Sequence, residues 1–403
     1  MRSGITIHLR RLVLPVYVPV ALLSLGVSAP VAGFPQYLGG LGAAVAVVGV
    51  VIAMRGVGNL LGDMPSGLVL GRWRLRSVVF TALVAAGVTS AAMATVRSVV
   101  VIGVLVLLTG AMTSVVVTAM MTYVRMTVPA SVRGRALSLT GGAVRVGALV
   151  GPIAGGLLAD IWNVPAAIGL RAVCFFVAAA AFALSPDRGV GAPGPSAGAM
   201  PSIAKQLRAI GRGLRGRGYA LATVGFAILM LQLLRTSRTI VLPLWGDGLG
   251  LSTILIGSVM SVGAALELVL FVPSGIIMDH AGRKVAAGLC IGIFAIGMLW
   301  LSMAKGLPGF IVASILIGIG NGFGSGINMT IGTDLAPSGA VSEFLGVWRL
   351  FGDVGSSAGP AIVGTIATAG GLPLAVVATA ALGFLGLVSL AFAPEPMHLS
   401  ERE

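Results

Sequence analysis

Charged residues are scarce in this chain: Asp, Glu, Lys and Arg make up only 9% of its 403 residues. A soluble domain carries about 25% charged residues, which help to cover its surface in water. Here 57% of the residues are hydrophobic and the mean hydropathy is +1.05. These charges are too few to cover the surface of a soluble protein of this size. They suffice if lipid is the solvent for most of the surface. The composition therefore predicts an integral membrane protein.

Cysteine and histidine are also rare, which limits metal and redox chemistry. The two cysteines, Cys174 and Cys290, lie inside apolar runs without a C-x-x-C spacing, so we expect two packed thiols. The three histidines are scattered, at His8, His280 and His398. No phosphate-binding G-x-x-x-x-G-K-[ST] sequence is present. We therefore expect no metal and no cofactor.

The net charge of +14 would suit a nucleic-acid partner, but the positions of the basic residues argue against one. They occur in short segments between apolar runs and form no basic face on an amphipathic helix. Lys and Arg gather in this way in the cytoplasmic loops of membrane proteins. The expected partner is the lipid bilayer, with no nucleic acid.

Apolar runs long enough to cross a bilayer, which takes about twenty residues, recur along the chain. We predict twelve spans, at 12–33, 43–64, 78–97, 100–124, 137–159, 165–185, 219–242, 252–274, 285–304, 308–331, 345–367 and 373–393. Arginines precede the first run as in a signal peptide, but its length and the later spans favour a retained helix. The predicted fold class is an all-α integral membrane protein with twelve transmembrane helices.

One long polar stretch, rich in Pro, Gly, Ser and Arg, divides these spans into two sets of six. We predict an N-terminal six-helix bundle (1–185), a cytoplasmic basic linker (186–218) and a C-terminal bundle with a short cytoplasmic tail (219–403). Most Lys and Arg residues fall on the cytoplasmic side if the N-terminus is inside, and three fall outside: Arg97, Arg171 and Lys305. This predicts a multi-pass protein of the cell inner (plasma) membrane with both termini cytoplasmic.

The two halves repeat each other at one ungapped offset of 208 residues, which separates Pro243 from Pro35. The same offset pairs Pro65-Ser66-Gly67 with Pro273-Ser274-Gly275, and Gly151-Pro152 with Gly359-Pro360. Two parallel six-helix repeats related by a pseudo-twofold axis are an architecture in which substrate binds near the midplane between the repeats.

The segment after the eighth predicted span carries a motif, Gly275-Ile-Ile-Met-Asp279-His-Ala-Gly282-Arg283-Lys284. It resembles motif A of the major facilitator superfamily, G-x-x-x-D-x-x-G-R-K. Glycine permits a tight turn, the Asp is able to face a helix N-terminus, and the basic pair is expected at the anionic inner leaflet. The first-half counterpart, from Gly67, has a glycine in place of the Asp. The alternative is that both loops are merely basic topology anchors.

The fifth predicted span resembles the antiporter motif C of that family, G-x8-G-x3-G-P-x2-G-G. The matching residues are Gly147, Gly151, Pro152, Gly155 and Gly156, with a serine in place of the first Gly. This resemblance implies the twelve-helix drug:proton antiporter branch. Small residues also let membrane helices pack closely, so generic packing is the alternative. The family's motif B arginine has no match, because Val106 holds its position, and proton coupling through that residue is not carried over.

Charges inside spans are costly and mark function by default. In the family fold the second and eleventh helices adjoin, as do the fifth and eighth. Matching depths along these helices predict three cross-half ion pairs that form when the inner side closes: Arg55–Asp353, Asp63–Arg349 and Arg145–Glu267. Glu267 and Asp353 are then the expected proton carriers, because separation from arginine promotes protonation of a carboxylate. The alternative is a set of purely structural pairs.

Polar residues in two further spans are candidates for contact with substrate. Gln232, Arg235 and Arg238 share one face of the seventh span, although Arg238 alternatively snorkels to the outer interface. The tenth span has five glycines at alternate positions and two amides, Asn321 and Asn328. We expect a closely packed or bent helix whose amides bond neighbouring helices or touch substrate.

Together these features predict a secondary transporter, not an enzyme, in which the halves rock about a central site and a proton gradient supplies the energy. The leading hypothesis is proton-coupled efflux of small hydrophobic or amphipathic compounds. An alternative is proton-coupled or facilitative uptake of a small organic metabolite, and the five arginines within spans would suit an anionic one. A minor alternative is a non-transporting membrane sensor. The expected partners are a small-molecule substrate, protons and lipid, and nothing indicates an oligomer, so a monomer is expected.

Overall fold

The computed structural model describes residues 9, 11–186, 218–336 and 341–393. Nearly all of the predicted linker lies outside the described residues. Within the described ranges the chain is 90% helix and contains no strand, and its candidate membrane spans fall into two halves. The predicted all-α membrane fold class is confirmed.

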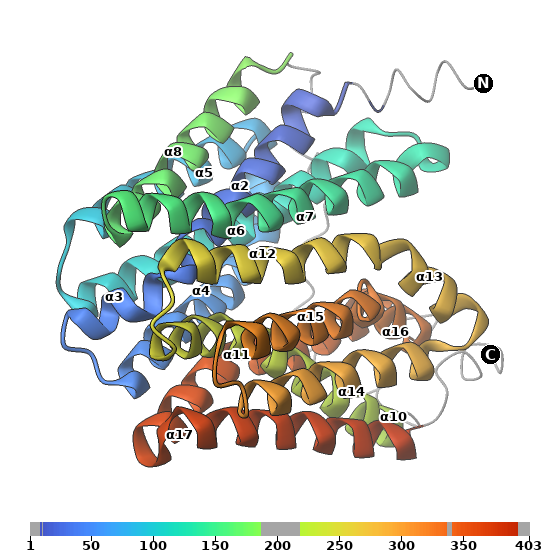
Figure 1. The fold of residues 1–403 in the computed structure, drawn as a ribbon. Helices are drawn as coiled ribbons and strands as arrows, with labels where there is room; N and C mark the ends of the chain where they lie inside the picture. Colours follow the sequence, from blue (N-terminus) through green and yellow to red (C-terminus); the bar gives the residue numbers. More distant parts are fainter. Residues whose placement is uncertain (1–8, 10, 187–217, 337–340, 394–403) are drawn as a thin grey trace. The chain divides into compact units, whose positions relative to one another are not determined.

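The first half consists of long apolar helices joined by short turns (Figure 1). Its elements are η1 (Val13–Tyr17), α2 (Val18–Ser28), η2 (Ala29–Ala32), α3 (Phe34–Gly40), α4 (Val45–Arg72), α5 (Leu75–Thr95), α6 (Val99–Thr127), α7 (Ala130–Ile161) and α8 (Val164–Leu184). Sequence sets the ends of these helices. For example, α6 ends where Val128 is held extended by the following Pro129, because the residue before proline avoids the helical region.

The second half is built in the same way but contains more breaks. Its elements are α10 (Gly218–Ala220), η3 (Leu221–Gly225), α11 (Phe226–Gly248), α12 (Thr253–Val269), α13 (Phe271–His280), α14 (Arg283–Leu301), α15 (Leu307–Phe323), α16 (Ile327–Leu335) and α17 (Val341–Phe392). Figure 1 shows α12 continuing into α13 through a bend, which measures 44°.

The number of spans follows from length and composition. In the described part of the chain, 10 helices are long and apolar enough to cross a membrane, and the bent pair α12 and α13 makes 11. One of these, α17, has 52 residues and would be about 78 Å long, far beyond the ~30 Å hydrocarbon core. Its backbone leaves the helical region at Gly371, where φ is 86° and ψ is 163°. We therefore count α17 as two spans, which brings the total to the twelve predicted.

The described residues form two compact units whose borders differ from those predicted for the bundles. Two helices are divided between the units. The first residues of α4, up to Ala53, belong to the second unit, and the first residues of α12, up to Ser261, belong to the first. Otherwise the first unit contains the described residues before Ala44 and from Met54 to the linker, and the second contains the rest. We call Ala44–Ala53 and Leu251–Ser261 the exchanged segments.

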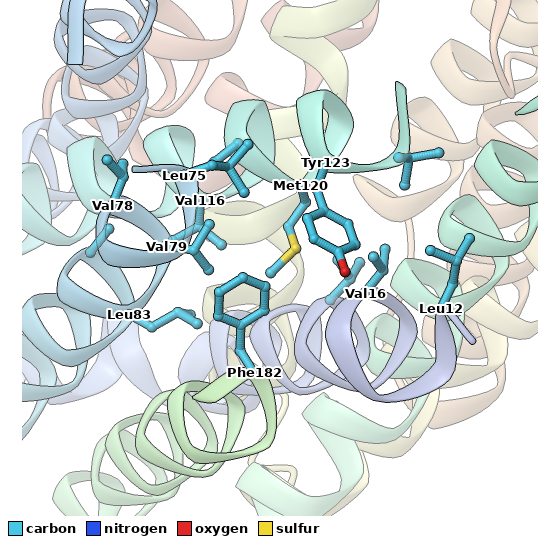
Figure 2. Close-up of a cluster of buried hydrophobic side chains, with 14 of the residues drawn as sticks. Leu12, Val16, Leu75, Val78, Val79, Leu83, Val116, Met120, Tyr123 and Phe182 are labelled. Carbon is cyan, nitrogen blue, oxygen red and sulfur yellow. The ribbon is translucent and has the colours of Figure 1, made fainter. Parts of the chain in front are cut away.

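The first unit has a dense apolar core where α5, α6 and α8 meet the N-terminal helix (Figure 2). The rings of Tyr123 and Phe182 meet edge to face, with centroids 6.2 Å apart. Around them lie Leu12, Val16, Leu75, Val78, Val79, Leu83, Val116 and Met120. Lipid is as apolar as these side chains, so close packing rather than escape from water stabilises such a core.

Candidate functional site

A network of polar side chains lies inside the apolar second unit and centres on Arg235 of α11. Its Nε donates to Asn321 Oδ1 at 2.6 Å, its Nη1 to Gln232 Oε1 at 3.0 Å, and its Nη2 to the main-chain oxygen of Gly324 at 2.8 Å. The predicted face of the seventh span and the predicted amide of the tenth are therefore brought together. All five N–H groups of a guanidinium are donors, which is why one arginine is able to join three groups.

The glycine-rich tenth span is broken, as the sequence led us to expect of a bent helix. α15 ends at Phe323, and α16 starts after Gly326, whose φ of +81° is left-handed. A break at membrane depth leaves carbonyl groups without helical partners, and neighbouring side chains must satisfy them. Arg235 does so at Gly324, while Ser274 Oγ donates to the oxygen of Phe323 at 2.6 Å.

Asn328 follows this break, in the first turn of α16. Its side-chain Oδ1 is buried and has no hydrogen-bond partner among the described residues. Its main-chain oxygen accepts a hydrogen bond from Trp348 Nε1 at 2.8 Å, which fixes the position of the residue. A fixed, unsatisfied acceptor of this kind is available to a ligand.

Arg238 and Glu267 form an ion pair between α11 and α12. Their side chains are 26% and 16% exposed, so the pair is largely removed from solvent. The pair lies next to Arg235, which is three residues before Arg238 on the same helix. The sequence did not reveal this pair, because Arg238 was considered only as a cavity wall or a snorkelling residue. The partner of Glu267 in this structure is an arginine of the same half, and not the arginine of the other half that was expected from its depth in the membrane.

The carboxylate of Asp63, on α4, accepts hydrogen bonds from two hydroxyl groups of α6, those of Ser114 and, at 3.3 Å, Thr118. These hydroxyl partners were not foreseen. Arg145 Nη1 donates to the oxygen of Gly141 on its own helix, α7, at 3.1 Å. These contacts anchor both predicted site residues within the first unit.

The three predicted cross-half pairs, Arg55–Asp353, Asp63–Arg349 and Arg145–Glu267, stay predictions. On α17, Arg349 is exposed and Asp353 half-buried. Arg55 is exposed on α4 and makes no hydrogen bond or ion pair with any described residue.

One residue was placed wrongly. Arg171 was counted among the basic residues outside the membrane, but it lies two turns inside α8 and is only 8% exposed. It is therefore a further charge inside a span, and the predicted span 165–185 already contained it although the charge count placed it outside.

The motif A loop of the second half is held by its basic residues. Gly282, with φ 97° and ψ 158°, makes the turn from α13, which carries Gly275, into α14. Arg283 is turned inward, 15% exposed, with Nε 2.9 Å from Asp334 Oδ2 and Nη1 3.3 Å from Asp279 Oδ1. Asp334 was not foreseen. Asp279 is 71% exposed.

Lys284 Nζ donates to the main-chain oxygens of Ala391 and Ala393, at 2.7 and 2.8 Å, and so caps the end of α17. Arg283 and Lys284 thus bond protein groups, and their expected position at the inner leaflet stays a prediction. In the first half Gly67 lies within α4, which remains helical up to Arg72.

The motif C glycines of α7 allow near backbone contact with the first span. A Cβ on Gly147, Gly151 or Gly155 would overlap the carbonyl oxygens of Ala21, Leu25 and Ala29 respectively. In the second unit, Gly355 and Gly359 of α17 meet the carbonyl oxygens of Leu229 and Leu233 on α11. Adding 208 to the first-unit numbers reproduces these contacts, so the sequence repeat is also a repeat of helix packing.

The exchanged segments pack through a second pair of repeated contacts. In the first unit Gly257 faces the carbonyl oxygen of Pro152, and Gly156 faces that of Thr253. In the second unit Gly49 faces Pro360, and Gly364 faces Val45, at the same offset.

A side chain caps each exchanged segment. Asp160 accepts hydrogen bonds from the N–H groups of Thr253 and Ile254, at 2.9 and 3.0 Å, and so caps the N-terminus of α12. At the equivalent place Thr368 Oγ1 accepts from the N–H of Ala46 at 2.8 Å. A carboxylate therefore holds one segment and a neutral hydroxyl the other.

No three His, Cys, Asp or Glu residues gather as a metal site in the parts searched, which are the described ranges.

Comparison with known proteins gives one clear family and several structural relatives. The model of the Major Facilitator Superfamily matches residues 18–360 and 224–403, which together cover most of the chain. The arabinose-proton symporter of Bacillus subtilis (strain 168) is 30% identical over 112 residues, a stretch of 28% of this chain and 22% of that protein. The chain thus matches about a fifth of that relative's length.

Two solved structures share the fold. The peptide transporter POT, solved with sulfate, superposes with a TM-score of 0.78 at 16% identity and covers 97% of this chain and 95% of its own. The nucleoside transporter NupG superposes with a TM-score of 0.74 at 13% identity and covers 94% and 98%. At these identities the likeness concerns the fold alone. The helical architecture, the repeated packing and the family match lead to one conclusion: the chain is a multi-pass membrane transporter that belongs to the Major Facilitator Superfamily.

Proposed function

We propose that this transporter is a proton-coupled exporter of small amphipathic compounds that works by alternating access. The observation that carries the proposal is the ion pair of Arg238 with Glu267 inside apolar helices. A charged pair in a span is costly to keep, and carboxylates in such positions are the usual proton carriers of secondary transporters. Both side chains keep some accessible surface, which a proton needs in order to reach the carboxylate.

Glu267 is the proposed proton carrier and Arg238 its electrostatic partner. Arginine holds its proton at all relevant pH values, so only the carboxylate of the pair exchanges one. Protonation of Glu267 removes the attraction to Arg238 and frees its guanidinium for the substrate or for movement of α11. Arg235 on the same helix bonds Asn321 and Gly324, so movement of α11 is passed to the break in the tenth span.

The substrate is proposed to meet the polar side chains next to this pair. Gln232 and Arg235 on α11 and the unsatisfied Oδ1 of Asn328 supply donors and acceptors within an apolar surround. A few polar groups in an apolar site are suited to an amphipathic ligand. The resemblance of α7 to the antiporter motif C favours export and the drug:proton antiporter branch. Asp353, Arg349, Asp63, Arg145 and Arg55 keep their proposed roles in gating pairs.

A second candidate is proton-coupled uptake of a small organic solute. The arabinose-proton symporter match, although short, favours it because that protein is a symporter. Transport direction in proteoliposomes of fixed orientation separates the two candidates.

The test is transport into and out of proteoliposomes with an imposed pH gradient. Wild type is expected to drive fluorescent amphipathic compounds against their gradient. Glu267→Gln should lose the response to the pH gradient but keep downhill exchange, since it keeps the shape and removes the titrating group. Asp247→Asn, which changes an exposed carboxylate near the end of α11 and outside the network, is the matched control and should keep both. Full pH-driven accumulation by Glu267→Gln would refute the proposed coupling.

A further inference from the structure

The described charges of the first unit do not balance inside its spans. Arg55, Arg145 and Arg171 lie in α4, α7 and α8, whereas the unit's described carboxylates are Asp63 and Asp160. Asp63 bonds hydroxyl groups of α6, and Asp160 caps α12. Neither forms an ion pair with Arg55 or Arg171.

Arg171 is the clearest case of a charge without compensation. The residue is only 8% exposed, and its Nε has no hydrogen-bond partner in the described chain. Its Nη2 points to the sulfur of Met93 on α5, at 2.8 Å. A thioether is a weak acceptor and carries no charge, so this contact does not offset the cost of burying a guanidinium.

Arg55 lies near Arg171 at a comparable depth. Arg171 is the eighth residue of α8, about 10 Å from its start, and Arg55 is the eleventh of α4, about 15 Å from its start. Both helices are predicted to start at the outer face. Arg55 and Arg171 act on each other electrostatically as like charges. Arg55 is exposed and has no hydrogen-bond or ion-pair partner among the described residues.

The position of Arg55 is fixed by backbone packing. Gly110 of α6 lies against the carbonyl group of Arg55, and Gly58 and Gly62 of α4 lie against the backbone of Leu107 and Ala111. Such contact leaves the α4 backbone little freedom to withdraw the charge. Arg171 is buried and Arg55 is exposed at a comparable depth, so an anion that contacts both guanidinium groups would offset the cost of the buried charge.

We infer that Arg55 and Arg171 bind an anionic group, a carboxylate or a phosphate, carried by the transported compound. Guanidinium groups are well suited to it, because their planar donor pairs match both oxyanions in two-point contacts. The inference deepens the proposed function by giving the amphipathic substrate an acidic end. That end binds in the first unit.

The experiment measures anion-dependent thermal stability of the purified full chain in a neutral detergent. Sodium phosphate and sodium succinate are compared with sodium chloride at equal ionic strength and pH. Ligand that binds the folded state raises the unfolding temperature. Wild type should be stabilised by phosphate or succinate over chloride. Arg55→Gln and Arg171→Met should lose that rise, and Arg97→Gln, an exposed arginine outside the cluster, should keep it.

Arg171→Met carries a second, opposite expectation. In chloride it should unfold at the same temperature as wild type or higher, because an uncompensated buried charge gives way to an apolar side chain of similar length. A merely structural arginine would instead make the variant less stable. If Arg171→Met does not fold, the inference is overturned, since removal of the arginine side chain should not harm the fold.

The remaining outcomes also decide the matter. No rise in wild type, or a rise kept by both Arg55→Gln and Arg171→Met, refutes the site. A rise in nanodiscs with phosphatidylglycerol but none with phosphate or succinate assigns the charges to lipid headgroups, and overturns the substrate assignment. The assay needs no proton gradient, so a rise retained by Glu267→Gln leaves this inference intact even if coupling through Glu267 fails.

Discussion

At the scale of single residues, partners were harder to foresee than positions. Gln232, Arg235 and Arg238 do share a face of α11, as their three-residue spacing required. Their partners Asn321 and Glu267 depend on which way α12 and α15 turn, and a long arginine reaches several candidates. Spacing along one helix is local information, whereas a contact between helices is not, so the pairs could not be predicted from spacing.

Glycine contacts make a sharp prediction at the same scale. Gly155→Ala places a Cβ onto the carbonyl group of Ala29, so α7 and the first span must separate, at a cost of about 1–3 kcal/mol. Gly142→Ala, in the same helix with open space around its Cβ, should cost nothing or stabilise by up to about 1 kcal/mol. Thermal unfolding in detergent measures both. Equal unfolding temperatures for the two variants would contradict the close packing.

At the scale of elements, apolar run length located the spans within a few residues, for example 165–185 against Val164–Leu184 for α8. The breaks were less predictable. The glycines of the tenth span indicated a bend, and the structure has one at Gly324–Gly326. The bend of α12 into α13 does have a local cause: Pro273 has no N–H to bond the carbonyl group of Val269, and its ring crowds that group. The sequence analysis matched Pro273 to Pro65 in the repeat but did not expect a break there.

The cap on α12 is testable at this scale. Asp160→Ala removes the acceptor for two N–H groups and should destabilise the protein by about 0.5–2 kcal/mol. Asp160→Asn keeps an oxygen acceptor and should retain most of the stability, since Asn and Asp cap helices about equally well. The readout is the unfolding temperature of each variant. An Asp160→Ala protein as stable as Asp160→Asn would show that the cap contributes nothing.

At the scale of the whole molecule, composition and the 208-residue repeat were sufficient to predict the fold class. The repeat holds down to individual contacts, since Gly147 on Ala21 is matched by Gly355 on Leu229. The exchange of helix ends between units was not predictable, because a polar linker in the sequence does not indicate which helix turns pack together.

The predicted topology can be tested by labelling cells with a membrane-impermeant maleimide. Cys174 and Cys290 are buried, so wild type should react little. Ser98→Cys, between α5 and α6, should react in intact cells if the N-terminus is cytoplasmic. Arg74→Cys, between α4 and α5, should react only after permeabilisation. The reverse pattern would invert the orientation inferred from Lys and Arg.

The exchanged segments have a consequence for any attempt to divide the molecule. A cut within the polar linker leaves Ala44–Ala53 on one fragment, although those residues complete the packing of Pro360 and Gly364 on the other. The reciprocal holds for Leu251–Ser261 and Pro152. Each fragment thus retains a segment that packs in the other unit and lacks a segment that packs in its own. Produced alone, either should be incomplete; produced together, they should recognise each other as two interlocking parts without a covalent join.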